Sequence, residues 1–209
     1  MASKKNSYSF AETKIFQRLD TPAKIQDFLN GIKFNFESQG DTCQSPRRVL
    51  KSRKAHCMEG AMLAAAILEF HGYKPLVMDL KAAKHDFDHV VALFRAGECW
   101  GALSKTNHSV LRYREPIYKT LRELAMSYFH EYFDDRGRKN LRGYSIPFNL
   151  KRFDNIGWRT SEEDLFEIPE ALDEARHLPL LGFGQIRSLR QADRIEIIAG
   201  KIVEFKKPR

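Results

Sequence analysis

Residues 58–70 form an apolar stretch in which only Glu59 and Glu69 are charged and alanines fill the middle. A helix that is apolar on nearly every side belongs in the interior of a protein. Gly72 follows it, and glycine is common just after the end of a helix. The pattern therefore predicts a buried central helix that begins at Cys57.

Three short runs rich in branched and aromatic residues follow this helix, at residues 75–80, 89–94 and 99–103. The second and third are separated by an Arg-Ala-Gly-Glu turn, which is typical of an antiparallel hairpin. His89 opens the first strand of that hairpin. We therefore expect an α+β core in which the Cys57 helix packs against an antiparallel sheet.

Further helices are predicted on both sides of this core. Thr21 and Pro22 provide an N-cap and a first-turn proline for an amphipathic helix, and the residues before them are polar and loosely ordered at their very start. Pro116 opens a helix with one apolar stripe, and Ser188 caps a last helix that ends at Gly200. The chain is then a single domain of residues 1–209, with a core at about 21–114 and a helical C-terminal elaboration at about 115–209.

The connecting segments are less regular. Pro147 keeps residues 144–150 from forming a regular helix. A helix that follows Ser161 is broken or restarted at Pro169, and residues 178–184 form a loop. Residues 201–205 are expected to close as a short strand.

The composition, 43% hydrophobic and 30% charged over 209 residues, is that of a globular protein and not of a disordered chain. No run reaches the roughly 18 apolar residues of a membrane span, and the first ten residues lack the apolar region of a secretory signal. Three cysteines without a Cys-x-x-Cys pair argue against a disulfide framework or a structural zinc site. We expect a cytoplasmic protein with no cofactor, metal or membrane partner, and the oligomeric state stays open.

The net charge of +8 raises the question of nucleic-acid binding. The basic residues are clustered, but no recognised nucleic-acid motif accompanies them. Charge alone is weak evidence for such a partner. Nucleic acid is therefore a disfavoured partner that the charge does not exclude.

Cys57 is the first candidate for chemistry. At the start of a helix, unpaired backbone N–H groups and the helix dipole favour an anion, which lowers the pKa of a thiol. Positive charge on Arg53, Lys54 and His56 adds to this bias. His89 is the partner that a thiolate–imidazolium pair needs. Two alternatives stay open, in which Cys57 is a small buried hydrophobe and His89 an ordinary half-buried strand histidine.

The segments VLKSRKAHCMEGAMLAAAILEFHGYKPLVM, DHVVALF and GECWGALSKT, in this order, resemble the transglutaminase-like superfamily over about residues 45–107. The resemblance implies a papain-like fold with a Cys–His–Asp constellation, in which Cys57 is the nucleophile and His89 the general base. It also implies hydrolysis or acyl transfer at an amide or ester through a Cys57 thioester, without a metal or cofactor. The substrate would be a protein or a peptide-like molecule.

The third catalytic position departs from this family. Where an Asp usually follows the Trp, the chain reads Leu-Ser-Lys-Thr, so that Ser104 stands in the place of the acid and Asn107 lies three residues on. A neutral partner can orient an imidazole but cannot stabilise its positive charge. Gln44, His56 and Trp100 are further candidates for oxyanion binding or for lining the site, although an exposed loop position is the favoured interpretation of Gln44.

Ser104 keeps a second hypothesis open, in which the chain is a catalytically impaired binding module that uses a basic surface to bind an acidic partner. Asp79, on the preceding strand, is the carboxylate that could restore the missing charge. A third hypothesis, nucleic-acid binding without the enzyme fold, rests on charge alone.

Overall fold

The computed structural model describes residues 8–207 and has the α+β class expected from the sequence. Its main sheet is antiparallel, with the strand order β6 (Arg114–Tyr118), β5 (Cys99–Ser104), β4 (His89–Ala96), β3 (Leu76–Ala82), β7 (Leu141–Ser145) and β9 (His177–Pro179). A further short strand, β8 (Phe148–Asn149), also pairs with β3. Separately, β1 (Lys33–Phe34) and β2 (Lys54–Ala55) form a parallel pair.

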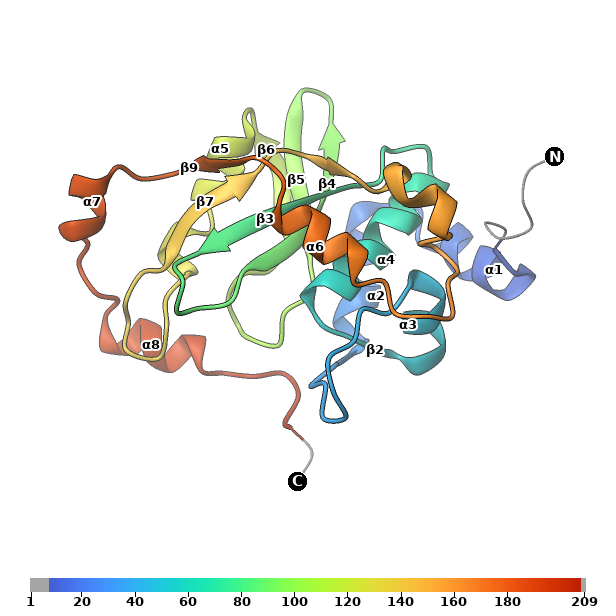
Figure 1. Cartoon of the computed structure of the whole chain (residues 1–209), viewed down its shortest axis with the longest axis horizontal. Coiled ribbons are helices and arrows are strands. Elements are labelled where there is room, and N and C mark those ends of the chain that lie inside the picture. The colour runs from blue at the N-terminus through green and yellow to red at the C-terminus, as the bar shows by residue number, and fades with distance from the viewer. Residues whose placement is uncertain (1–7, 208–209) are drawn as a thin grey trace.

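Helices lie on both faces of the main sheet (Figure 1). The larger layer contains α1 (Phe10–Arg18), α2 (Pro22–Asn30), α3 (Pro46–Ser52), α4 (Cys57–Phe70), the 3₁₀ segment η3 (Leu150–Ile156) and α6 (Glu167–Asp173). The opposite face is covered by α5 (Leu121–Met126) and the 3₁₀ turn η2 (Phe129–Glu131). Two short helices, α7 (Phe183–Arg187) and α8 (Arg194–Gly200), complete the chain.

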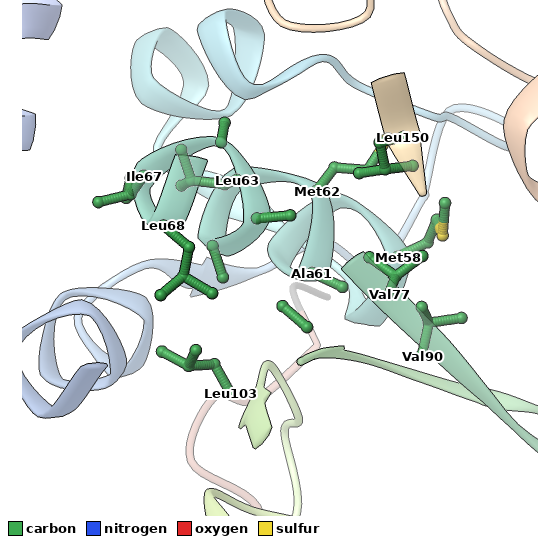
Figure 2. Close-up of a cluster of buried hydrophobic side chains, with 14 of the residues drawn as sticks. Met58, Ala61, Met62, Leu63, Ile67, Leu68, Val77, Val90, Leu103 and Leu150 are labelled. Carbon is green, nitrogen blue, oxygen red and sulfur yellow. The ribbon is translucent and has the colours of Figure 1, made fainter. Parts of the chain in front are cut away.

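The predicted central helix is present as α4, which begins at Cys57. All its side chains from Met58 to Leu68 are buried, and they pack against β3, β4 and β5 (Figure 2). Gly60 allows a close approach, because a Cβ atom there would stand 2.3 Å from the Cβ atom of Lys105. The start of α4 therefore lies directly against the segment that follows β5.

The strands of the sheet alternate between two buried clusters. Val77, Val90 and Ala92 face the α4 layer, whereas Met78 and Val91 face the α5 layer. A sheet covered on both faces needs apolar residues at every position, which explains why the three runs after α4 lack a polar alternation. The three predicted strands correspond to β3, β4 and β5.

The segment after residue 114 differs most from the prediction. A helix opening at Pro116 was wrong, because residues 114–118 form β6 at the edge of the sheet. An edge strand tolerates a proline, which has no N–H to donate. The apolar stripe was expected to consist of Ile117, Leu121, Leu124, Tyr128 and Tyr132. Its last three members are buried, whereas Ile117 is 68% exposed.

The C-terminal half is also not the helical elaboration expected from the sequence. Its strands β7 and β9 extend the main sheet beyond β3, and β8 lies where residues 144–150 were expected to be irregular. The helix expected after Ser161 begins only at Glu167, with Pro169 tolerated in its first turn. The sheet therefore draws on both halves of the chain.

Three smaller segments also depart from expectation. In the polar N-terminal region α1 is held by a reciprocal cap, in which Glu12 N–H donates to Ser9 Oγ and Ser9 N–H to Glu12 Oε2. The loose order expected at the very start falls on residues outside the described range. Near the other end, α7 lies where a loop was expected, and α8 follows Asp193 instead of Ser188. Within residues 201–205, Val203 forms a single bridge to His108.

Within residues 8–207, no helix has both the length and the apolar character needed to cross a membrane.

Candidate active site

Cys57 is half-buried at the first position of α4 and lines a cavity of about 570 Å³ together with His56 and His89. Burial raises the pKa of the Cys57 thiol, but hydrogen bonds from His56 and His89, together with their charges, hold it well below its usual value of 9.0. The start of a helix also favours an anion at this position. These features favour a thiolate, as expected from the sequence.

His89, at the start of β4, has its Nε2 atom 2.8 Å from Ser104 Oγ. The Ser104 hydroxyl also lies 2.6 Å from the carbonyl oxygen of Leu111, which can only accept, so the hydroxyl donates its proton there. It must then accept from His89 Nε2–H. This assignment leaves Nδ1 as the ring nitrogen of His89 that faces Cys57. The predicted hydrogen bond between Ser104 and His89 is therefore present.

The Leu111 carbonyl also explains why a serine suits this position. A carboxylate in place of Ser104 would face that carbonyl oxygen without a proton between them, inside a site that is 1% exposed. Two buried acceptors in contact would be unfavourable. A hydroxyl satisfies both neighbours because it donates to one and accepts from the other.

Gln26 of α2 holds Ser104 in place. Its side-chain oxygen accepts from Ser104 N–H at 2.9 Å, and its Nε2 donates to the Ser104 carbonyl oxygen at 2.8 Å. Both groups are buried, where paired hydrogen bonds fix a backbone more firmly than they do in water. Gln26 thus positions the partner of His89, a role that the sequence pattern did not reveal.

His56 precedes Cys57 and is anchored from the side opposite the thiol. Its Nε2 lies 3.0 Å from the Thr42 carbonyl oxygen, 3.6 Å from Glu59 Oε1 and 3.7 Å from Glu37 Oε1. Burial alone would lower the pKa of His56, but the hydrogen bond and charge of Cys57, followed by the charge of Glu59, raise it to about 9. This pKa favours the imidazolium form of His56 at neutral pH.

Glu59 holds the loop that surrounds His56. Its carboxylate is 0% exposed and accepts from Thr42 Oγ1 at 2.8 Å, from Gln44 N–H at 2.9 Å and from His56 N–H at 3.0 Å. A buried carboxylate is tolerated only with several such donors. The one sequence signal for this role was a charge inside an otherwise apolar helix.

The structure does not assign the expected electrostatic role to Arg53 or Lys54. Both side chains are exposed, and the Arg53 guanidinium lies 4.8 Å from the ring centroid of Phe28. Of the three basic residues before Cys57, His56 is the one that contacts the thiol.

The remaining candidates are dispersed. Asn107 lines the cavity, but its side chain bonds both backbone groups of Phe205 and not His89. Gln44 is 7% exposed, so the favoured prediction of an exposed loop position was wrong. Gln44 is nevertheless not among the described residues that line the cavity. Trp100 also lies outside that lining, beneath the Arg95 guanidinium at 5.0 Å.

Asp79 does not supply the missing carboxylate to His89. Its Oδ2 atom lies 2.9 Å from His177 Nε2 instead. The neutral Ser104 is therefore the observed partner of His89 in the described structure.

Comparison of the chain with protein-family models and with curated proteins finds no match. The site must be interpreted from its own geometry.

The other two cysteines provide internal references. Burial, followed by the charges of Glu59 and Asp164, raises the pKa of Cys43 to about 12. Cys99 lies at the start of β5, beside the hairpin turn, and is half-buried. All three thiols are free, so Cys57 differs from the others in its environment and not in its oxidation state.

Residues distant in sequence complete the cavity wall. Lys105 and His108 follow β5, Glu131 belongs to η2, and Ile197 and Lys201 come from the α8 region. Figure 1 shows the chain after α8 continuing along the lower edge of the molecule towards the C-terminal end. The cavity thus places Cys57 and His89 at the boundary between the α4 layer and the C-terminal segment.

Proposed function

We propose that the chain is a transglutaminase-like cysteine hydrolase or acyltransferase that acts on an amide or ester through a Cys57 thioester. The observation that carries this proposal is a thiol at the start of a buried helix, in contact with two imidazoles and facing a cavity. A papain-like core is part of the proposal, since α4 packs against an antiparallel sheet whose strand β4 begins with His89.

The proposed reaction divides the work between the two histidines. The Cys57 thiolate attacks the carbonyl carbon, and the carbonyl electron pair moves to oxygen to give a tetrahedral anion. This anion collapses, the carbon–nitrogen or carbon–oxygen bond breaks, and the leaving group takes a proton from the His89 imidazolium. Water or an amine then attacks the thioester while His89 Nδ1 accepts its proton, and the Cys57 thiolate leaves.

His56 has a different task in this scheme. Its Nε2–H is directed to the Thr42 carbonyl and lies near two carboxylates, which favours a permanent imidazolium. A fixed cation beside the sulfur supplies the charge stabilisation that Ser104 cannot give through His89. The backbone N–H groups of Cys57 and Met58, at the start of α4, are the proposed oxyanion donors.

The pH dependence of alkylation tests the proposal. In a Cys99→Ser background, labelling by iodoacetamide near neutral pH should be selective for Cys57, because the raised pKa of the buried Cys43 thiol keeps that thiol protonated. The lowered pKa of Cys57 should make this labelling rapid. The variant His89→Ala should shift the rate profile to higher pH. A Cys57 that reacts like a free thiol in both proteins would argue against the enzyme.

The second candidate function is a catalytically impaired module that binds an acidic partner through its basic surface. The neutral contact between Ser104 and His89 favours it, as does the net charge of +8. Inert Cys57, together with salt-sensitive binding of an acidic peptide, would support this candidate.

A further inference from the structure

Three carboxylates, from β3, from the connection between β3 and β4 and from α6, lie close together. Asp79 lies on β3, Asp88 immediately precedes β4, and Asp173 is the last residue of α6. One ligand oxygen of each lies within 4.8 Å of the others. Oxygens on opposite sides of one bound Ca²⁺ are separated by about 4.6–5.2 Å, so this spacing is that of oxygens around a single ion.

Asp79 provides an independent indication of a missing ligand. The residue is 1% exposed, and its Oδ2 atom lies 2.9 Å from His177 Nε2. Its Oδ1 atom is buried and has no hydrogen-bond partner among the described residues. A buried carboxylate oxygen without a partner is costly and rare in native proteins.

Lys81 accounts for only part of the negative charge. Its Nζ atom lies 2.6 Å from Asp88 Oδ2 and 3.7 Å from Asp173 Oδ1, and it leaves Asp79 Oδ1 unsatisfied. The Lys81 side chain is 40% exposed, so its ammonium group can turn to solvent when another cation enters.

His177 is the hydrogen-bonding partner of the second carboxylate oxygen of Asp79, Oδ2. Its Nδ1 lies 2.7 Å from the Ala175 carbonyl oxygen, which can only accept, so Nδ1 carries a proton. The contact between Nε2 and Asp79 Oδ2 then needs a second proton, either on His177 or on Asp79. A cation at Oδ1 would favour the arrangement with ionised Asp79 and protonated His177.

We propose that Asp79, Asp88 and Asp173 bind one hard divalent cation, with water completing its coordination. Carboxylate oxygens suit Mg²⁺, Ca²⁺ and Mn²⁺. The site does not depend on the chemistry of Cys57.

Titration of the full chain at pH 8, with Mn²⁺ followed by electron paramagnetic resonance and with Ca²⁺ and Mg²⁺ by calorimetry, tests the proposal and distinguishes the ions. We expect one bound ion per chain. The exposed Asp173→Asn change should weaken binding about tenfold or more, whereas the neighbouring Glu174→Gln change should leave it within about twofold. Cys57→Ser should bind like the unmodified chain.

Lys81→Met provides the decisive comparison, because it removes the competing ammonium group. We expect this variant to bind the ion more tightly and to gain more thermal stability from it than the unmodified chain. Absence of binding in both proteins would overturn the proposal. Binding that Asp173→Asn leaves unchanged would place the ion elsewhere and would overturn it equally.

Discussion

Replacing His56 by glutamine is the sharpest test of the electrostatics at Cys57. Glutamine retains hydrogen-bonding capacity but carries no charge. The rise of the His56 pKa from 6.5 to about 9 corresponds to about 3 kcal/mol in favour of the imidazolium. Part of this energy comes from the Cys57 thiolate, and coupling between two sites is reciprocal.

The rate effect follows from this energy. If half of it, about 1.5 kcal/mol, is coupling to Cys57, the thiolate fraction on the acid limb of the pH profile falls about tenfold. A more basic thiolate is more nucleophilic and recovers about threefold of that loss. Alkylation by iodoacetamide should therefore slow about three- to tenfold on the acid limb. At high pH, where both thiols are ionised, the variant should react as fast as the unmodified protein or up to about threefold faster.

Two measurements are needed, both in the Cys99→Ser background. The first is the alkylation rate of His56→Gln from pH 5 to 10, for which superimposable profiles would refute the role of His56. An equal slowing at every pH would indicate steric obstruction instead. The second is stability, because a raised pKa stabilises the fold fully below 6.5 and ceases to do so as the pH passes about 9. The variant should lose about 3 kcal/mol more at pH 6 than at pH 10.

Three other substitutions test the surrounding contacts. Ser104→Ala removes the hydroxyl that bonds the Leu111 carbonyl and His89, and it should lower the free energy of unfolding in urea by about 1–3 kcal/mol. The variant should also lose more turnover of an ester substrate than rate of alkylation. An unchanged turnover would contradict the positioning role of Ser104. Glu59→Gln should lower the free energy of unfolding by about 3 kcal/mol, because the groups that donate to Glu59 lose a charged acceptor. The control Glu98→Gln, at an exposed position, should change it by no more than about 0.5 kcal/mol. Equal effects of the two substitutions would contradict the role of Glu59 in holding the loop around His56. Burial lowers the pKa of Lys105 from 10.5 to about 8, and its Nζ atom donates to the Ile32 carbonyl oxygen, a bond that Lys105→Met removes. The free energy of unfolding of the variant, relative to that of the unmodified protein, should therefore be about 3 kcal/mol more favourable at pH 7 than at pH 11, and the change should fall between pH 8 and 10.5, since the folded amine becomes neutral first. A difference independent of pH would contradict this reasoning.

The sequence was most informative where one element dictated its own environment. The apolar surface of α4 required burial on all sides, and the hairpin turn determined the pairing of β4 with β5. Segment 114–118 was misassigned because Pro116 is compatible with both a helix start and an edge strand, and only its neighbour β5 decides between them.

The residues of the candidate site also differ in how well the sequence predicts them. Cys57, His56 and His89 could be named from local order along the chain. Gln26 could not, because its contact with Ser104 joins residues 78 positions apart. A single amide side chain in an amphipathic helix carries no local signal of such a contact.

The wall formed by Ile197 and Lys201, together with the bonds between Asn107 and Phe205, has a consequence for biosynthesis. Asn107 and Phe205 are separated by 98 positions, so at translation rates of 5–20 residues per second Phe205 is added about 5–20 s later. During that interval the nascent chain holds Cys57, His56 and His89 but lacks one wall of their cavity. Newly made molecules would therefore pass through a period in which the thiol is exposed to oxidants and electrophiles from one more side than in the finished protein.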